Sequence, residues 1–142
     1  MDRQRIANAL LLLRLGVFIV MIMWTLDKFI NPQHAGAVFE NFYGLSGFPG
    51  AAFKVIGFLQ LLVVLAFVAG FMKRYSYGLI LVLHGISTLS SWQQYLDAFN
   101  NLLFFAAWPM LAACIALYML RDLDTRWTVD DRMNSVSPAA GG

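Results

Sequence analysis

Two ionisable side chains, Arg14 and His84, stand inside long apolar runs, where such groups are costly and commonly serve a function. Arg14 lies eight residues into the first run and His84 nine residues into the third. At 1.5 Å per residue of α-helix, these positions are about 12 Å and about 13 Å from the same interface, so we expect them at one level. A neutral imidazole can donate one hydrogen bond and accept another, which suits a quinone carbonyl or a quinol hydroxyl. Arg14 could stabilise negative charge on such a ligand.

Further polar residues recur at three- and four-residue steps along the third run, and therefore share one face of a helix. They are Tyr77, His84, Ser87, Thr88, Ser91 and Gln94 or Tyr95. The second run contributes Gln60, with Gly57 one turn away. We predict a polar pocket for a quinone-like ligand, formed by Arg14, Gln60, His84 and Thr88.

Two other interpretations of these residues stay open. In the first, they serve packing alone: the hydroxyls bond their own helix backbone, and Arg14 extends towards the headgroups along its flexible stem. His84 would then bond Thr88 or Gln60. In the second, the polar residues line a conducting path.

Several chemistries are disfavoured. The one cysteine, Cys114, cannot cycle an internal disulfide. A haem with two histidine ligands is disfavoured because His34 falls outside the apolar runs, although His84 and a methionine remain a formal alternative. No spacing of His, Cys and carboxylates is typical of a zinc or di-iron site, and no Ser or Cys has a base at a recognisable distance. We expect no catalytic residue, no metal site and no intrinsic cofactor, with quinone as the candidate ligand.

Four apolar runs must position these residues, and each is as long as the ~20 residues that a membrane-spanning helix needs. The chain is 60% hydrophobic and 13% charged, far from the roughly 25% charged residues of a soluble domain. Only helices and closed barrels satisfy the backbone in lipid, and the alternating segments of a barrel are absent from the sequence. We predict an all-α integral membrane protein with spans at about 6–29, 51–72, 75–96 and 99–120.

Basic residues predict the orientation of these spans. Arg3 and Arg5, then Lys73 and Arg74, then three arginines after residue 120 fall on one side of the predicted membrane. We expect that side, with both termini, to be cytoplasmic. The net charge of +2 does not suggest a nucleic-acid partner.

The links predict an up-down four-helix bundle, because two of them are short. The longer link begins with Asn31 and Pro32 and ends near Gly44, which are typical helix start and stop residues. It predicts a short amphipathic helix in the outer interface, followed by a glycine-rich turn. Asp27, just before this link, is expected to meet Lys54.

Two further predictions concern the last span and the tail. Pro109 lacks an amide donor, so it should free the carbonyl of Phe105 and kink the helix. We expect one domain at 1–121, and a polar cytoplasmic tail at 122–142 that is disordered.

The chain resembles the DoxX-like proteins, which are small four-helix bacterial membrane proteins. The resemblance rests on Leu12-Leu-Arg14-Leu-Gly16, on Asp27-Lys28-Phe-Ile-Asn31-Pro32 and on His84-Gly-Ile-Ser-Thr-Leu-Ser-Ser91. The resemblance implies a role in membrane redox systems. Members of the family include a thiosulfate:quinone oxidoreductase subunit and factors that mature periplasmic oxidoreductases.

These observations favour an accessory or anchor subunit of a redox complex in the bacterial inner membrane, more a non-catalytic subunit than an enzyme by itself. Its expected partners are the lipid bilayer and other membrane or periplasmic subunits. It would contribute to a quinone-binding site. The alternative is an autonomous oligomeric carrier or channel for a small solute.

Overall fold

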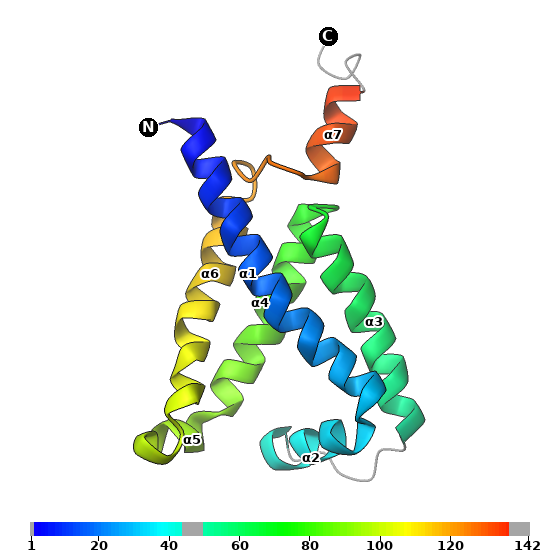
Figure 1. The fold of residues 1–142 in the computed structure, drawn as a ribbon, viewed down its shortest axis with the longest axis vertical. Helices are drawn as coiled ribbons and strands as arrows, with labels where there is room; N and C mark the ends of the chain where they lie inside the picture. Colours follow the sequence, from blue (N-terminus) through cyan, green and yellow to red (C-terminus); the bar gives the residue numbers. More distant parts are fainter. Residues whose placement is uncertain (1, 44–49, 137–142) are drawn as a thin grey trace.

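The computed structural model describes residues 2–43 and 50–136, and these residues form helices joined by short links, with no strand among them (Figure 1). The predicted all-helical class is confirmed. The elements are α1 (Arg3–Ile30), α2 (Pro32–Tyr43), α3 (Gly50–Val68), α4 (Lys73–Ser90), α5 (Trp92–Leu96), the 3₁₀ turns η1 (Ala98–Asn100) and η2 (Leu102–Ala106), α6 (Ala107–Met119) and α7 (Val129–Val136).

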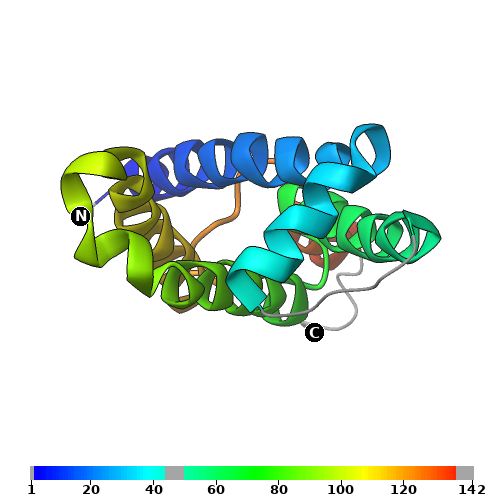
Figure 2. The ribbon, with the colours of Figure 1, turned by 90° about the horizontal axis from the view of Figure 1, so that it is seen from below.

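The long helices alternate in direction along the chain. In Figure 1, α1 and α4 run downwards, and α3 and α6 run upwards. Helix α1 contacts α3 and α6, and α4 contacts the same two helices from the other side, so the four surround a common centre (Figure 2). Helix α2 crosses the lower end and contacts α1, α3 and α4. Helix α7 lies at the upper end, where α1 begins.

Within the described residues, three helical segments are long and apolar enough to cross a membrane: Arg3–Ile30, Ala51–Val68 and Leu102–Met119. Helix α4 is not among them, because its first turns are polar and His84 interrupts its apolar stretch. That α4 crosses the bilayer as a fourth span stays a prediction.

The third predicted span, 75–96, differs from the structure, because α4 ends at Ser90 and α5 follows after Ser91. The Ser91 hydroxyl donates to the carbonyl of Ser87 at 3.1 Å, a bond from a serine to the preceding turn that bends helices.

The predicted kink at Pro109 is wrong. The chain is in 3₁₀ conformation up to Ala106, and α6 begins at Ala107, so Pro109 occupies the first turn. Amides of a first turn have no partner inside their own helix, so proline costs little there. The carbonyl of Phe105 is not freed either, because the amide of Ala107 donates to Phe104 and Phe105.

The tail predicted as disordered, 122–142, is folded over residues 122–136. The amide of Val129 donates to the carbonyl of Ala69 at 2.7 Å. The Asp130 carboxylate accepts from the amides of Met72 and Lys73 at 2.8 and 2.9 Å, which caps the start of α4. Polar composition suggested disorder, yet these polar groups are the ones that anchor the segment. Residues 137–142, and most of the predicted glycine-rich turn, lie outside the described residues.

The apolar core lies mainly in the upper half of the molecule, at and below the first turns of the long helices around Arg14. Its buried side chains include Leu10, Val17, Val64, Phe67, Ile80, Cys114 and Leu117. The lower part, around α2, is less completely filled, and a cavity lies there.

Candidate functional site

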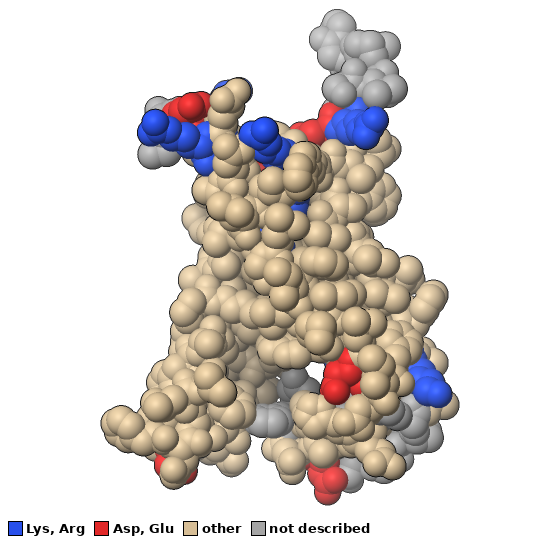
Figure 3. All heavy atoms as spheres, viewed as in Figure 1, with Lys and Arg blue, Asp and Glu red and all other residues tan. Residues whose placement is uncertain are grey.

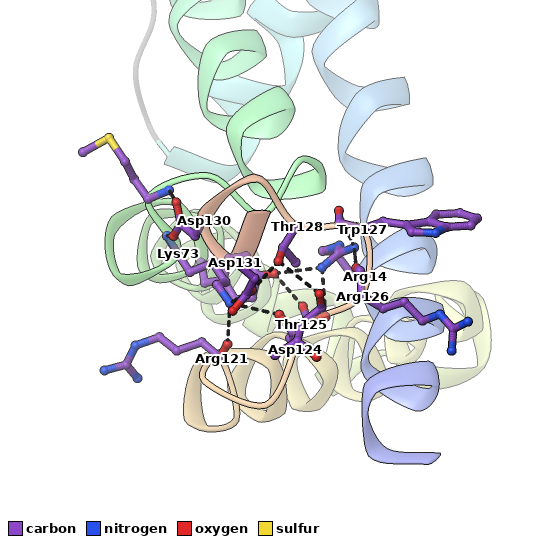
Figure 4. Close-up of polar contacts among 12 residues, drawn as sticks. Arg14, Lys73, Arg121, Asp124, Thr125, Arg126, Trp127, Thr128, Asp130 and Asp131 are labelled. Carbon is purple, nitrogen blue, oxygen red and sulfur yellow. Dashed lines mark hydrogen bonds and ion pairs between the residues drawn. The ribbon is translucent and has the colours of Figure 1, made fainter. Parts of the chain in front are cut away.

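The upper end of the molecule holds a buried ion pair between Arg14 of α1 and Asp124, which follows α6 (Figure 4). Nη1 of Arg14 lies 2.8 Å from Oδ1 of Asp124, and the side chains are 1% and 0% exposed. The hydroxyl of Tyr77 donates to the other carboxylate oxygen at 2.5 Å. Nη2 of Arg14 donates to the carbonyls of Arg126 and Trp127 at 2.6 and 3.2 Å. The guanidinium therefore binds the C-terminal segment across the top of α4.

A second polar cluster beside this pair surrounds Lys73 (Figure 4). Its ammonium donates to the carbonyls of Arg121 and Asp124 at 3.0 and 2.9 Å, and to the carboxylate of Asp131 at 2.7 Å. All three Lys73 donors are thus used, and Thr128 adds a further hydrogen bond to Asp131. Most donors at this end are paired, with the Arg14 Nε an exception among the described residues. The arrangement closes the upper end.

A cavity of about 1070 Å³ lies between α1, α3, α4 and α6, with α2 at its lower side. This volume is in the range of sites for small organic molecules. The walls are mostly apolar, and the space-filling view shows the molecule hollowed below its middle, beside an acidic side chain (Figure 3). Polar residues gather in the lower half of the lining: Asp27, Lys28, His34, Gln60, His84, Ser87, Thr88 and Ser91.

Gln60 is a polar side chain of this cavity whose whole carboxamide is unpaired. Its side chain is half-buried in the lining and makes no hydrogen bond to any described residue. Apart from Lys54 in its first turns, the rest of helix α3 is strongly apolar. An unpaired amide in apolar surroundings costs free energy until water or a ligand satisfies it, and the carboxamide can both donate and accept. Gln60 is therefore the side chain best suited to bind a ligand.

His84 forms part of the cavity wall, and its contacts are largely fixed. Its Nε2 lies 3.1 Å from the carbonyl of Ala107, so Nε2 carries the proton and donates. The ring stacks on Trp24, with centroids 5.9 Å apart and an interplanar angle of 27°. Nδ1 is buried and has no partner among the described residues.

Several hydroxyls of the predicted polar stripe bond backbone carbonyls of their own helix or of the adjoining one. Thr88 donates to the carbonyl of His84 at 2.8 Å, as Thr25 does to Met21. Tyr95 donates to the carbonyl of Thr88 at 2.8 Å. These bonds agree with the packing interpretation, in which hydroxyls in apolar helices satisfy themselves on the backbone.

The lower mouth of the cavity carries charge. His34 of α2 lies 2.5 Å, from Nδ1 to Oδ2, from Asp27 at the end of α1, and both line the cavity. The predicted partner of Asp27 was Lys54, and that prediction is wrong, because the turn from α1 into α2 brings His34 back over Asp27.

The structure brings Gln60, His84 and Thr88 together around the cavity, but it separates Arg14 from them. His84 stacks on Trp24, ten residues beyond Arg14 on α1, or about 15 Å along the helix axis. The expected common level of Arg14 and His84 is therefore wrong. It assumed that both helices begin at one plane, whereas α1 begins at Arg3 and extends above the start of α4.

Sequence reasoning missed Asp124, the partner of Arg14. The available signal was charge complementarity: four aspartates follow residue 121, while Arg14 inside the first apolar run and Lys73 in the link after the second lie towards the same end. Within the part of the chain that the structure describes, no group of three or more His, Cys, Asp or Glu side chains could hold a metal ion.

Comparisons with protein-family models, with curated proteins and with solved structures find no match for this chain.

Proposed function

We propose that this protein is a four-span membrane protein of the bacterial inner membrane whose cavity binds a quinone, as an accessory subunit of a redox complex. The observation that carries the proposal is the cavity of about 1070 Å³ with apolar walls and one unpaired carboxamide, Gln60. A quinone matches such a site, because its ring is apolar at its faces and its oxygens form hydrogen bonds. The resemblance to DoxX-like proteins supports the redox context.

In this proposal Gln60 binds the ligand oxygen, while Trp24 and His84 form a wall of stacked rings beside it. Gly57 is packed against Lys28 and Phe29, so Gln60, one turn further along α3, lies near the level of Trp24. The Gln60 amide can donate to a quinone carbonyl or accept from a quinol hydroxyl. His84 holds the wall in place through Ala107.

The alternative function, a carrier or channel, receives less support. A continuous pore would have to pass the upper end, where Arg14, Tyr77 and Asp124 fill the space with paired, buried side chains. Native purification in mild detergent separates the two functions. An accessory subunit co-purifies with unlike chains, whereas a carrier purifies alone as a defined oligomer.

Quinone binding to the purified protein tests the proposal directly. We expect saturable binding of a short-chain ubiquinone analogue, and Gln60→Leu should weaken it about tenfold, because a ligand oxygen is then left unpaired. The matched control is Gln93→Leu, which makes the same change at an exposed position outside the cavity. Absence of saturable binding, or equal affinity of the two variants, would contradict the proposal.

The orientation is tested separately by cysteine labelling. A membrane-impermeant thiol reagent added outside should modify Gln33→Cys in α2 and leave Arg74→Cys unmodified; both positions are exposed. The native Cys114 is buried and gives little background. The reverse pattern would invert the proposed topology.

A further inference from the structure

The cavity has a second opening, between α1 and α6, which differs from its charged lower mouth. Leu12 and Leu13 line the cavity although they are 70% and 38% exposed, so the space reaches the outer surface at these residues. The lining from α6 opposite them includes Pro109, Met110 and Ala113. None of these side chains is charged.

Gly16 marks the open space along this seam. A Cβ placed on Gly16 would meet no atom of a described residue within 4 Å. On the neighbouring seam, between α1 and α3, a Cβ on Gly57 would lie 3.1 Å from the ring of Phe29 and 3.2 Å from Cβ of Lys28. Helix α1 is therefore tightly packed on α3 and leaves a gap towards α6.

The two openings differ in what they can admit. The lower mouth carries Asp27, Lys28 and the Asp27–His34 pair, which favour water and polar groups. The gap between α1 and α6 is lined by apolar side chains, which suit a hydrocarbon chain. If α1 and α6 span the bilayer, this gap faces lipid tails and offers no polar barrier to a lipophilic molecule.

We infer that the gap between α1 and α6 is a lateral portal that holds the hydrocarbon tail of the ligand whose polar ring lies at Gln60. This inference rests on the proposed function. The path from the level of Trp24 to Leu12 covers twelve residues of α1, or about 18 Å. The ligand class is thus a quinone with a linear isoprenoid tail, which reaches the site from within the bilayer.

Photo-crosslinking with two probes tests this placement. Both probes are a benzoquinone with a farnesyl-length tail, one with a diazirine on the ring and one with a diazirine at the tail end. We expect the ring probe to label peptides around Gln60 and His84, and the tail probe to label peptides around Gly16 and Ala113. An excess of unlabelled quinone should abolish both signals.

The outcomes separate the portal from the proposed function. Tail labelling on α2, near His34 or Val38, together with competed ring labelling near Gln60, overturns the portal and keeps quinone binding. No competed ring labelling overturns the quinone function itself. Labelling that phospholipid suppresses as well as quinone does means that the occupant is a bilayer lipid, which also overturns both statements.

A variant that fills the portal with a side chain provides the second test, again by photo-crosslinking. Gly16→Phe places a ring in the open seam and should reduce tail-probe labelling about tenfold. The matched control, Ile19→Phe, adds a ring at a position 61% exposed that does not line the cavity. Equal labelling of both variants overturns the portal. If Gly16→Phe does not fold, the labelling sites on the unmodified protein still decide.

Discussion

The two ends of this molecule use buried polar residues in opposite ways. At the upper end, Arg14, Tyr77 and Asp124 satisfy one another and are almost completely buried. Around the cavity, Gln60 has no partner among the described residues, and Nδ1 of His84 is likewise unpaired. Apart from Nε of Arg14, the buried polar side chains of the first region are paired, whereas the cavity is open and keeps polar groups without a partner among the described residues.

This difference shows how an ionisable residue at membrane depth should be interpreted. Arg14 is the most conspicuous one in the sequence, yet it tethers the C-terminal segment and does not line the cavity. Paired buried groups fix a structure, whereas an unpaired group carries an unmet cost that a ligand can relieve. Gln60, which carries no charge, is therefore the stronger candidate for binding.

The largest effect should come from breaking the closed end. Asp124→Ala leaves the Arg14 guanidinium buried without its counter-ion, which typically costs about 3–5 kcal/mol in the free energy of unfolding. Thermal unfolding in detergent measures the loss. The control is Asp122→Ala, which removes a carboxylate from an exposed side chain. Equal stability of the two variants would show that the pair does not hold the end closed.

A double substitution tests whether Arg14 only stabilises the fold or also takes part in ligand binding. Arg14→Leu with Asp124→Leu removes both charges. The double variant should therefore lose less free energy of unfolding than the losses of Arg14→Leu and Asp124→Leu added together, with a coupling of about 2 kcal/mol. Quinone affinity of the double variant should equal that of the unmodified protein, because neither residue lines the cavity. A drop in affinity, measured under conditions where the variant stays folded, would place Arg14 in the binding site.

The helices could be predicted because apolar runs determine them locally. The first run, 6–29, matches α1, and the second, 51–72, overruns α3 by one turn, because the chain turns at Gly70. The helix predicted over the fourth run, 99–120, is wrong over its first third, where the chain is 3₁₀ up to Ala106. No hydropathy pattern distinguishes a 3₁₀ turn from the first turns of an α-helix.

The site was predictable only in part. Gln60, His84 and Thr88 could be grouped because helical spacing and neighbouring helices bring them together. The partner of Arg14 could not, because Asp124 is 110 residues away in a segment whose composition suggests disorder. The cavity was not predictable in its volume or openings either, since empty space depends on how helices diverge and leaves no sequence pattern.

Gly70 tests the tight packing of the closed end. Its φ is +64°, and a Cβ there would lie 2.5 Å from Cβ of Thr128 in the C-terminal segment. Gly70→Ala should therefore lower the free energy of unfolding by about 2 kcal/mol, through backbone strain and displacement of that segment. Thermal unfolding measures the loss, and proteolysis after Leu120 should become faster. An unchanged midpoint would mean that the segment is only loosely attached.

Alanine at Gly16 should change the free energy of unfolding in the opposite direction to alanine at Gly70, and by the smallest amount of these variants. Gly16 lies in the interior of α1, and a Cβ there meets no described atom within 4 Å. Alanine restricts the unfolded chain and favours the helix, so Gly16→Ala should raise the free energy of unfolding by about 0.5–1 kcal/mol. A single methyl group is too small to fill the seam, so tail-probe labelling should persist, unlike in Gly16→Phe. Loss of stability in Gly16→Ala would mean that α6 packs against Gly16. The seam between α1 and α6 would then be closed, and the cavity would not differ from the upper end in the way described.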